Sequence, residues 1–290
     1  MIKRGIAHIG VFFLRLISLL PLVVLFFFAR LLYYLIYYVV GYRKKIVRRN
    51  LTHSFPEKST AEIIAIEKKF YLYLSELMFE IIKMCSISEK ELLKRVKFTG
   101  LEQLEAHFEK GESILACSGH YGNWEWGSMA INLKISAQVM TIYKPLNNKI
   151  FDDFFSRFRS RFGSVLIPMR QTLRGISAYK NQITLLGFAS DQSPVQHEAR
   201  HFIDFLNQPT AALLGIEKIA KATNRPIYYF KLNVVKKGYY VVDISPLCLN
   251  PTATEEFEIT KLHFKFLEEI IKKKPQYWLW SHNRWKIKPQ

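Results

Sequence analysis

Cysteine is scarce in this sequence of 290 residues. Its three copies, Cys85, Cys117 and Cys248, lie far apart, and no two of them form a CxxC pair. An odd number of widely spaced cysteines in a chain of this size argues against a framework of disulfide bonds. The cysteine content therefore fits a protein of a reducing compartment.

Several motifs of hydrolases and metalloenzymes are also missing. The chain has no GxSxG sequence and so lacks the serine nucleophile elbow of the α/β-hydrolases. It has no HExxH sequence, and four histidines of its second half do not stand at the spacing of metal ligands: His197, His201, His263 and His282. We therefore expect no metal ion and no cofactor.

Acidic residues are absent from the first 56 positions, which hold nine lysines and arginines. The whole chain has a formal net charge of +18, from 42 basic and 24 acidic residues. A positive field of this size attracts nucleic acid, an anionic membrane or an acidic protein. Because half of the excess charge accompanies the most apolar part of the chain, we favour a membrane surface over nucleic acid.

The apolar segment 16–40 is long enough to cross a bilayer, for which about 20 residues suffice. Five basic residues follow it between Arg43 and Arg49, and basic residues beside such a segment stay on the cytoplasmic side. We therefore predict a membrane anchor with its basic flank over residues 1–50, and a single cytoplasmic domain over 51–290. Pro21 and Arg30 interrupt the apolar segment, which leaves open whether it crosses the bilayer or lies in its interface.

Beyond the anchor, helical patterns alternate with short apolar runs. A helix is predicted over 57–95, with Ser59 and Glu62 as its capping box. Apolar runs of strand length follow at 112–120, 138–145, 164–169 and 182–191, and helical patterns lie between these runs. A hairpin is predicted over 227–247, turning at Lys236-Lys237-Gly238, and a last helix over 254–274. This alternation indicates an α/β fold, a mostly parallel central sheet flanked by helices.

Three predicted strands end in residues that can carry chemistry. In an open α/β sheet, ligands bind beyond the carboxyl ends of the strands. His120 follows the first run, Tyr143 and Lys144 end the second, and Asp191 follows a later one. We expect these side chains to converge at one edge of the sheet.

The segment around His120 combines a histidine with two glycines at a strand-to-helix turn. An imidazole with its ordinary pKa near 6.5 accepts protons at cytoplasmic pH. Glu125 lies five residues further on, about 140° away on a regular helix, so the two meet only if His120 sits in the turn and Glu125 on the first helical turn. We predict that arrangement, with Glu125 on the far imidazole nitrogen, where a carboxylate fixes the tautomer. On spacing alone, a histidine that merely hydrogen-bonds within a loop remains the alternative.

The full string GHYGNWE (119–125) closely resembles the catalytic block of the bacterial lipid A late acyltransferases. These lauroyl and myristoyl transferases form part of the wider HxxxxD/E glycerolipid acyltransferase superfamily. Further segments are similar to other blocks of the family, in order, from about residue 40 to residue 286: YRKKIVRRNL (42–51), Tyr143-Lys144-Pro145-Leu146-Asn147-Asn148, Arg159 and Arg161 before Gly163, Asp191-Gln192, FLNQPTAAL (205–213) and PQYWLWSHNRWK (275–286). Lys144 departs from the pattern, because it replaces the usual arginine.

The resemblance implies a glycerolipid acyltransferase-like fold and an acyltransferase domain over 51–290. It implies that His120 is the general base, that Glu125 is its partner and that Asp191 is essential, together with Arg159 or Arg161, between which the sequence does not choose. Substrate-binding roles are implied for Tyr143, Lys144 and Asn147. The implied donor is acyl-acyl carrier protein, and the implied acceptor is a hydroxyl of a lipid A precursor at the cytoplasmic face of the inner membrane.

Three other interpretations stay open. Cys117, three residues before His120, could form a thioester as a nucleophile, but its place in an apolar strand favours a small buried hydrophobe. The same acyl transfer could serve another acceptor, such as a lysophospholipid, a phosphatidylinositol mannoside or an aminoacyl lipid, and the Lys144 departure leaves that choice undecided. A basic membrane-bound module that binds lipid or nucleic acid would explain the charge, but the sequence has no recognisable DNA or RNA motif.

Overall fold

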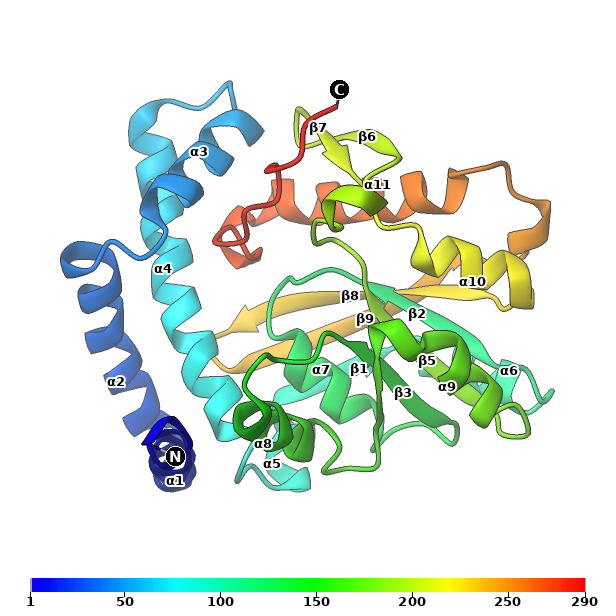
Figure 1. Ribbon diagram of the computed structural model, residues 1–290, viewed down its shortest axis with the longest axis horizontal. Helices are drawn as coiled ribbons and strands as arrows, with labels where there is room; N and C mark the ends of the chain where they lie inside the picture. Colours follow the sequence, from blue (N-terminus) through cyan, green and yellow to red (C-terminus); the bar gives the residue numbers. More distant parts are fainter. Residues whose placement is uncertain (1, 290) are drawn as a thin grey trace.

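The computed structural model describes residues 2–289, and within them seven strands form one sheet in the order β1-β9-β8-β2-β5-β3-β4 (Figure 1). All neighbouring strands are parallel except β8 and β9, which form an antiparallel hairpin. This arrangement confirms the α/β fold with a mostly parallel central sheet flanked by helices. The strands are β1 (Val96–Thr99), β2 (Ile114–Ser118), β3 (Gln138–Tyr143), β4 (Val165–Pro168), β5 (Thr184–Ala189), β8 (Ile227–Lys236) and β9 (Tyr239–Cys248).

Central strands such as β2 are apolar throughout because helices cover both faces of the sheet. Successive side chains of a strand point to opposite faces. Leu115 and Cys117 accordingly pack on the side of α10 (Gly215–Thr223) and α11 (Glu258–Lys273). Ile114 and Ala116 pack on the other side, with α6 (Leu101–Phe108), α7 (Trp124–Ile131) and α8 (Lys149–Arg159).

The helix predicted over 57–95 is divided. It begins with α4 (Thr60–Lys83), whose amino terminus has the predicted capping box between Ser59 and Glu62. The chain then turns, and Ser88 caps a second helix, α5 (Glu89–Arg95), which leads directly into β1. The sequence pattern missed β1 and also a short hairpin, β6 (Phe202–Phe205) with β7 (Gln208–Ala211), whose strands have only four residues each. Two further α-helices are α3 (Lys44–Ser54) and α9 (Thr172–Ala178).

The amino-terminal segment forms two helices, α1 (Ile2–Leu19) and α2 (Leu22–Tyr34), and α2 continues as a π-helix, η1 (Leu35–Val39). The break falls at Leu20 and Pro21, because a proline ring blocks continuation of the preceding helix. The apolar segment 16–40 is therefore divided at Pro21, one of the two interruptions that the sequence showed. Among residues 2–289, only Leu22–Val39 forms a helix apolar and long enough to cross a membrane, by length and composition. The division of the chain at residue 50 stays a prediction, and residues 50 and 51 both lie within α3.

Candidate active site

His120 lies at the carboxyl end of β2, in the tight turn that leads into α7. Gly122 in this turn has a φ of +61°, and a Cβ atom there would lie 2.1 Å from the Cδ2 atom of Leu232. A side chain at position 119 would likewise meet Leu267, at 2.6 Å. The two glycines therefore allow the turn to pack closely over the sheet. The imidazole keeps 16% exposure, so a substrate can reach it.

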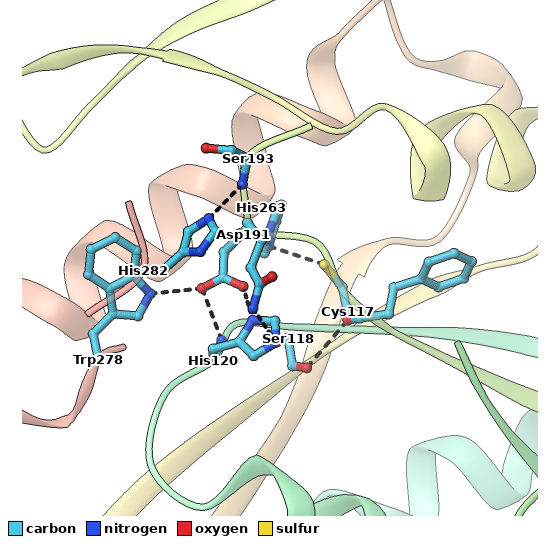
Figure 2. A network of polar contacts seen from close by, with 10 residues as sticks. Cys117, Ser118, His120, Asp191, Ser193, His263, Trp278 and His282 are labelled. Carbon is cyan, nitrogen blue, oxygen red and sulfur yellow. Dashed lines mark hydrogen bonds and ion pairs between the residues drawn. The ribbon is translucent and has the colours of Figure 1, made fainter. Parts of the chain in front are cut away.

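The partner of the imidazole is Asp191, which follows β5, the strand next to β2. His120 Nδ1 lies 2.5 Å from Asp191 Oδ1, and the His120 backbone N–H donates to Oδ2 at 3.0 Å. Trp278 Nε1–H donates to the same Oδ2 at 2.8 Å (Figure 2). The carboxylate is 2% exposed, and these three contacts hold it against the ring. The expected convergence of His120 and Asp191 at one edge of the sheet is confirmed.

Burial and charge oppose each other in this pair. Burial acts to raise the pKa of Asp191, but the neighbouring His120 and the hydrogen bonds outweigh it, and the pKa of Asp191 falls well below its ordinary value. Burial acts to lower the pKa of His120, but the charge and hydrogen bond of Asp191 outweigh it, and the pKa of His120 is raised. The pair thus stabilises a positive imidazolium beside a carboxylate.

Glu125 is not the hydrogen-bonding partner of His120, and this part of the prediction was wrong. It lies in the first turn of α7, as expected, but its carboxylate faces Arg159 in the last turn of α8. Arg159 Nε–H donates to Glu125 Oε2 at 2.8 Å, and Nη2–H donates to Oε1. The helix directs Glu125 toward α8, while Nδ1 of the ring turns toward the end of β5. A carboxylate 71 residues away in sequence therefore takes the place that the local spacing assigned to Glu125.

The structure separates the two candidate arginines. Arg159 forms a two-pronged ion pair with Glu125, a geometry that fits planar guanidinium and carboxylate groups. Burial acts to lower the pKa of Arg159, but Glu125 outweighs it and the pKa is raised. Arg161 instead donates to the backbone oxygen of Met84 at 2.9 Å and lies over the ring of Phe162. Only Arg159 therefore joins the polar groups around the turn.

The outer imidazole nitrogen, Nε2, is the candidate proton acceptor. It lies 3.1 Å from the side-chain nitrogen of Gln192. An amide nitrogen only donates, so in this arrangement Nε2 is the acceptor and the proton of a neutral ring lies on Nδ1, toward Asp191. The ring of Trp124 stands edge-on to the imidazole, with centroids 5.0 Å apart. Nε2 thus carries a lone pair that can accept a proton, next to the ring of Trp124.

The other predicted substrate-binding residues are scattered. Tyr143 ends β3 and is close enough to Arg159 to affect its pKa. Lys144 and Asn147 lie on the exposed loop after β3. Within the described residues, neither forms a hydrogen bond or ion pair with His120, Asp191 or Glu125. It is Asn148, beside Asn147, that caps α8 by accepting from the backbone N–H of Ile150 at 3.0 Å.

The segment 275–286 holds the active-site turn in place, a role that its sequence did not reveal. Its backbone pairs with the turn: Gly122 N–H donates to Tyr277 O at 2.9 Å, and Leu279 N–H donates to His120 O at 3.2 Å. Trp278 adds its bond to Asp191. Further along, His282 Nε2 accepts from the backbone N–H of Ser193 at 3.1 Å (Figure 2).

Cys117 is buried within β2 and fits the interpretation as a small core residue. Its sulfur lies 3.1 Å from His263 Nδ1. Burial raises the pKa of the Cys117 thiol and lowers the pKa of His263 to about 4. A thiol that stays protonated and has no exposed surface is a poor nucleophile.

The buried carboxyl group of Glu80, on α4, stabilises the turn through a hydrogen bond with Asn123. Glu80 Oε2 accepts from Asn123 Nδ2 at 2.7 Å and from the Tyr240 hydroxyl at 2.5 Å. Asn123 Oδ1 in turn caps α7 by accepting from the backbone N–H of Trp126 at 2.9 Å. Burial raises the pKa of Glu80 to about 7, so the carboxyl is largely protonated below neutral pH.

Glu80 should make stability depend on pH. Between the ordinary carboxyl pKa of 4.5 and the folded value of about 7, the unfolded chain releases the proton while the folded chain keeps it. The stabilisation is therefore complete below pH 4.5 and is lost as the pH rises toward 7. Between pH 5 and pH 8, Glu80→Gln, which mimics the neutral group, should gain about 2.5 kcal/mol of stability relative to the wild type. Urea denaturation in detergent at pH 5 and pH 8 measures the free energy of unfolding of the wild type and of Glu80→Gln. If this free energy changes with pH by the same amount in both proteins, the prediction for Glu80 is wrong.

The sequence model of the bacterial lipid A biosynthesis acyltransferase family matches residues 1–287, nearly the whole chain. The chain belongs to this family. It is therefore an acyltransferase, as the resemblance implied. Within residues 2–289, no group of three or more His, Cys, Asp or Glu side chains could hold a metal ion.

Individual relatives agree with this assignment. The acyltransferase is 25% identical, over 94% of its length and 85% of the relative, to the lipid A biosynthesis acyltransferase of Haemophilus influenzae. It is 23% identical to the lipid A biosynthesis palmitoleoyltransferase of Escherichia coli, over 85% of its length and 80% of the relative. It is 22% identical to the lipid A biosynthesis lauroyltransferase of the same species, over 86% and 80%. The two Escherichia coli relatives are named for different acyl chains, so the likeness leaves the chain length of this acyltransferase open.

Proposed function

We propose that this acyltransferase moves a fatty acyl chain from the thioester of acyl-acyl carrier protein to a hydroxyl of a lipid A precursor. The observation that carries the proposal is the orientation of His120. Its Nδ1 is held by a buried carboxylate, its Nε2 lies beside the Gln192 amide, and the side chain keeps 16% exposure. This is the arrangement that a general base for a substrate hydroxyl requires. No serine or cysteine nucleophile is needed, because the acceptor itself attacks.

In the proposed reaction, His120 Nε2 takes the hydroxyl proton as the acceptor oxygen bonds to the thioester carbonyl carbon. Asp191 stabilises the imidazolium that forms. The carbon–sulfur bond then breaks, and the imidazolium returns the proton to the departing thiolate. The products are an ester and a free thiol, and His120 is neutral again.

The Glu125–Arg159 pair has a different role in this proposal. Its guanidinium keeps 27% exposure, so it can bind a phosphate of the acceptor or of the phosphopantetheine arm of the donor. Glu125 holds the guanidinium in position and does not touch the reacting proton. Glu125 is thus a positioning residue for Arg159 and not the partner of the base.

An apolar contact region lies next to the catalytic pair, and it is closed, with no space for a water molecule. It lies between α4 and the segment 277–279, and Trp124 and Trp278, which contact the catalytic pair, form one end of it. Its wall on α4 consists of Phe70, Tyr73, Leu74 and Leu77. In this proposal the acyl chain enters here only when these side chains move apart, and burial of its methylene groups against them then favours binding.

Attachment to the cytoplasmic face of the inner membrane completes the proposal. The basic flank after η1 favours that face. Residues 57–290 keep a net charge of +9 once the nine basic residues of the first 56 positions are set aside. A positive surface steers an acidic carrier protein toward the site. The last twenty residues, with six basic and no acidic side chains, contribute to this surface.

The test is an assay with purified protein, acyl-acyl carrier proteins of several chain lengths and a panel of acceptors. We expect release of carrier thiol together with one added acyl chain on a lipid A precursor, seen by mass spectrometry. Acylation of a lysophospholipid alone would redirect the proposal to another acceptor. Absence of thioester consumption with every donor would contradict it.

Arg159→Ala and Arg161→Ala form a matched pair. Loss of Arg159 removes the exposed guanidinium and leaves the Glu125 carboxylate unpaired, so kcat/KM should fall about 100-fold. Loss of Arg161 removes one hydrogen bond to the backbone oxygen of Met84, at the end of α4, and kcat/KM should change less than about threefold. Steady-state kinetics of both variants checks this. Equal losses of kcat/KM in the two variants would show that pairing with Glu125 does not identify the arginine that functions in the reaction.

A further inference from the structure

The outer faces of α1, α2 and η1 expose a continuous series of large apolar side chains, which we call the apolar platform. Soluble proteins rarely expose patches of this extent without a partner. The platform side chains are between about two fifths and four fifths exposed. Six of them carry most of the argument: Phe12, Phe13 and Leu16 on α1, and Phe27, Phe28 and Leu31 on α2.

The opposite face of α2 packs along α4, and the two helices lie side by side (Figure 1). Leu22, Leu25, Ala29 and Tyr33 are buried on this face. At its far end, the Tyr37 ring of η1 contacts Tyr71 of α4, with centroids 5.2 Å apart. From end to end, therefore, α2 and η1 are attached to the catalytic domain.

Because of this attachment, α2 cannot cross a bilayer alone. Beside it, α4 carries three buried or nearly buried carboxyl groups, Glu67, Glu76 and Glu80. Glu67 pairs with Arg48, and Glu76 pairs with Lys237 at the turn of the β8–β9 hairpin. A spanning α2 would carry these charged groups and the hairpin turn into the hydrocarbon, where charged side chains are strongly disfavoured.

The corner between α1 and α2 is also fixed to the catalytic domain. Lys83 Nζ, at the end of α4, donates to the backbone oxygens of Ser18 at 2.8 Å and Leu20 at 3.0 Å. Ser86 donates to the same Ser18 oxygen. In Figure 1, α1 is seen end-on while α2 runs along α4, so the chain changes direction between the two helices. The platform therefore consists of two parts, α1 and α2 with η1, and both are attached to the catalytic domain.

The charges around the platform indicate an anionic lipid surface as its occupant. No acidic residue occurs in the first 56 positions, while Arg43, Lys45 and Arg49 are exposed just after η1. Exposed Tyr34, Tyr38 and Tyr42 at the same end suit the headgroup layer. A second copy of the same face would bring basic residues together with no acids to pair them, so the lipid is favoured over a dimer.

We infer that α1, α2 and η1 lie together in the plane of one leaflet, and that none of these helices crosses the membrane. The inference rests on the membrane attachment in the proposed function and adds its geometry. Both ends of the chain then lie on the same side of the bilayer. Trp124 and Trp278, which contact the catalytic pair, lie against α4, and α4 packs against α2 behind the platform, so a lipid acceptor reaches the site from the leaflet that holds the protein.

Sealed inside-out vesicles from cells that express the full chain test the topology. A short polar tag with a protease site is fused ahead of residue 1 in one protein and after residue 290 in another. We expect added protease to cut both tags without detergent. Protection of the amino-terminal tag until detergent is added would show that α2 spans the bilayer and would overturn the inference.

A matched pair of substitutions tests the lipid contact. Leu31→Asp lies on the platform and Leu173→Asp on α9, and the two leucines are 50% and 71% exposed. Binding of purified protein to vesicles of phosphatidylethanolamine and phosphatidylglycerol should weaken at least tenfold for Leu31→Asp and less than twofold for Leu173→Asp. Equal binding by both variants, or a wild-type dimer that Leu31→Asp dissociates without loss of vesicle binding, would contradict the inference.

The same experiments separate this inference from the proposed reaction. His120→Ala should bind vesicles and expose both tags as the wild type does, because His120 is not on the platform. If both tags are cut but the wild type consumes no acyl thioester, the proposed function fails and the in-plane geometry stands. If acyl transfer occurs but the amino-terminal tag is protected, only the geometry fails.

Discussion

Replacing His120 with alanine should lower the rate of acyl transfer by about 10²–10⁴-fold, the usual contribution of a positioned general base. The fold should survive, because Asp191 keeps its bonds from the His120 backbone and from Trp278. Single-turnover transfer from labelled acyl-acyl carrier protein measures the loss. His197→Ala, which removes a histidine side chain that is 81% exposed, is the matched control.

Two results would contradict this expectation. A His120→Ala variant within tenfold of the wild type would remove the imidazole from the chemistry. An equal loss in His197→Ala would mean that the assay responds to a general change in the protein. A thermal unfolding curve for each variant shows whether a loss of activity reflects a loss of structure.

Asp191→Asn should lower the rate by about 10³–10⁴-fold, because an amide neither stabilises the imidazolium nor fixes the tautomer as a carboxylate does. The pH dependence should change as well. The base must be neutral, so kcat/KM of the wild type rises through the raised pKa of His120. Without the negative charge that pKa falls, and the acidic limb of the profile moves to lower pH.

Profiles of kcat/KM between pH 5 and pH 9 measure both effects. Asp153→Asn is the control, since the Asp153 side chain is 62% exposed and pairs only with Lys149. A variant of Asp191 that loses activity but keeps the wild-type limb would show that Asp191 acts through the fold and not through the imidazole. An unchanged rate would exclude the pair altogether.

Local patterns were sufficient to predict the frame of the site. Some features are recognisable from residues that lie close together in the sequence. They are the apolar runs of β2, β3 and β5, the glycines near His120 and the capping box of α4. The rule that ligands bind beyond the carboxyl ends of parallel strands then brought His120 and Asp191 to one edge. The order of the strands, with β5 next to β2, supplies the direct contact between the two residues.

The partner of His120 could not be predicted from spacing. Glu125 was favoured because it is close in sequence, yet the direction of a side chain on α7 depends on where α8 packs. The contacts of Trp278 and His282 with the site depend on the path of the last segment, which forms only one isolated bridge, between Tyr121 and Trp278. Such non-local contacts leave no periodic pattern in the sequence.

The pairing of His120 with Asp191 is tested most directly by nitrogen NMR of the acyltransferase labelled at its histidines, with the His120 signals assigned by their loss in His120→Gln. We predict a neutral ring protonated on Nδ1, with a pKa above the ordinary 6.5, and loss of the raised pKa in Asp191→Asn. A neutral ring protonated on Nε2, or a pKa that Asp191→Asn leaves unchanged, would contradict the account.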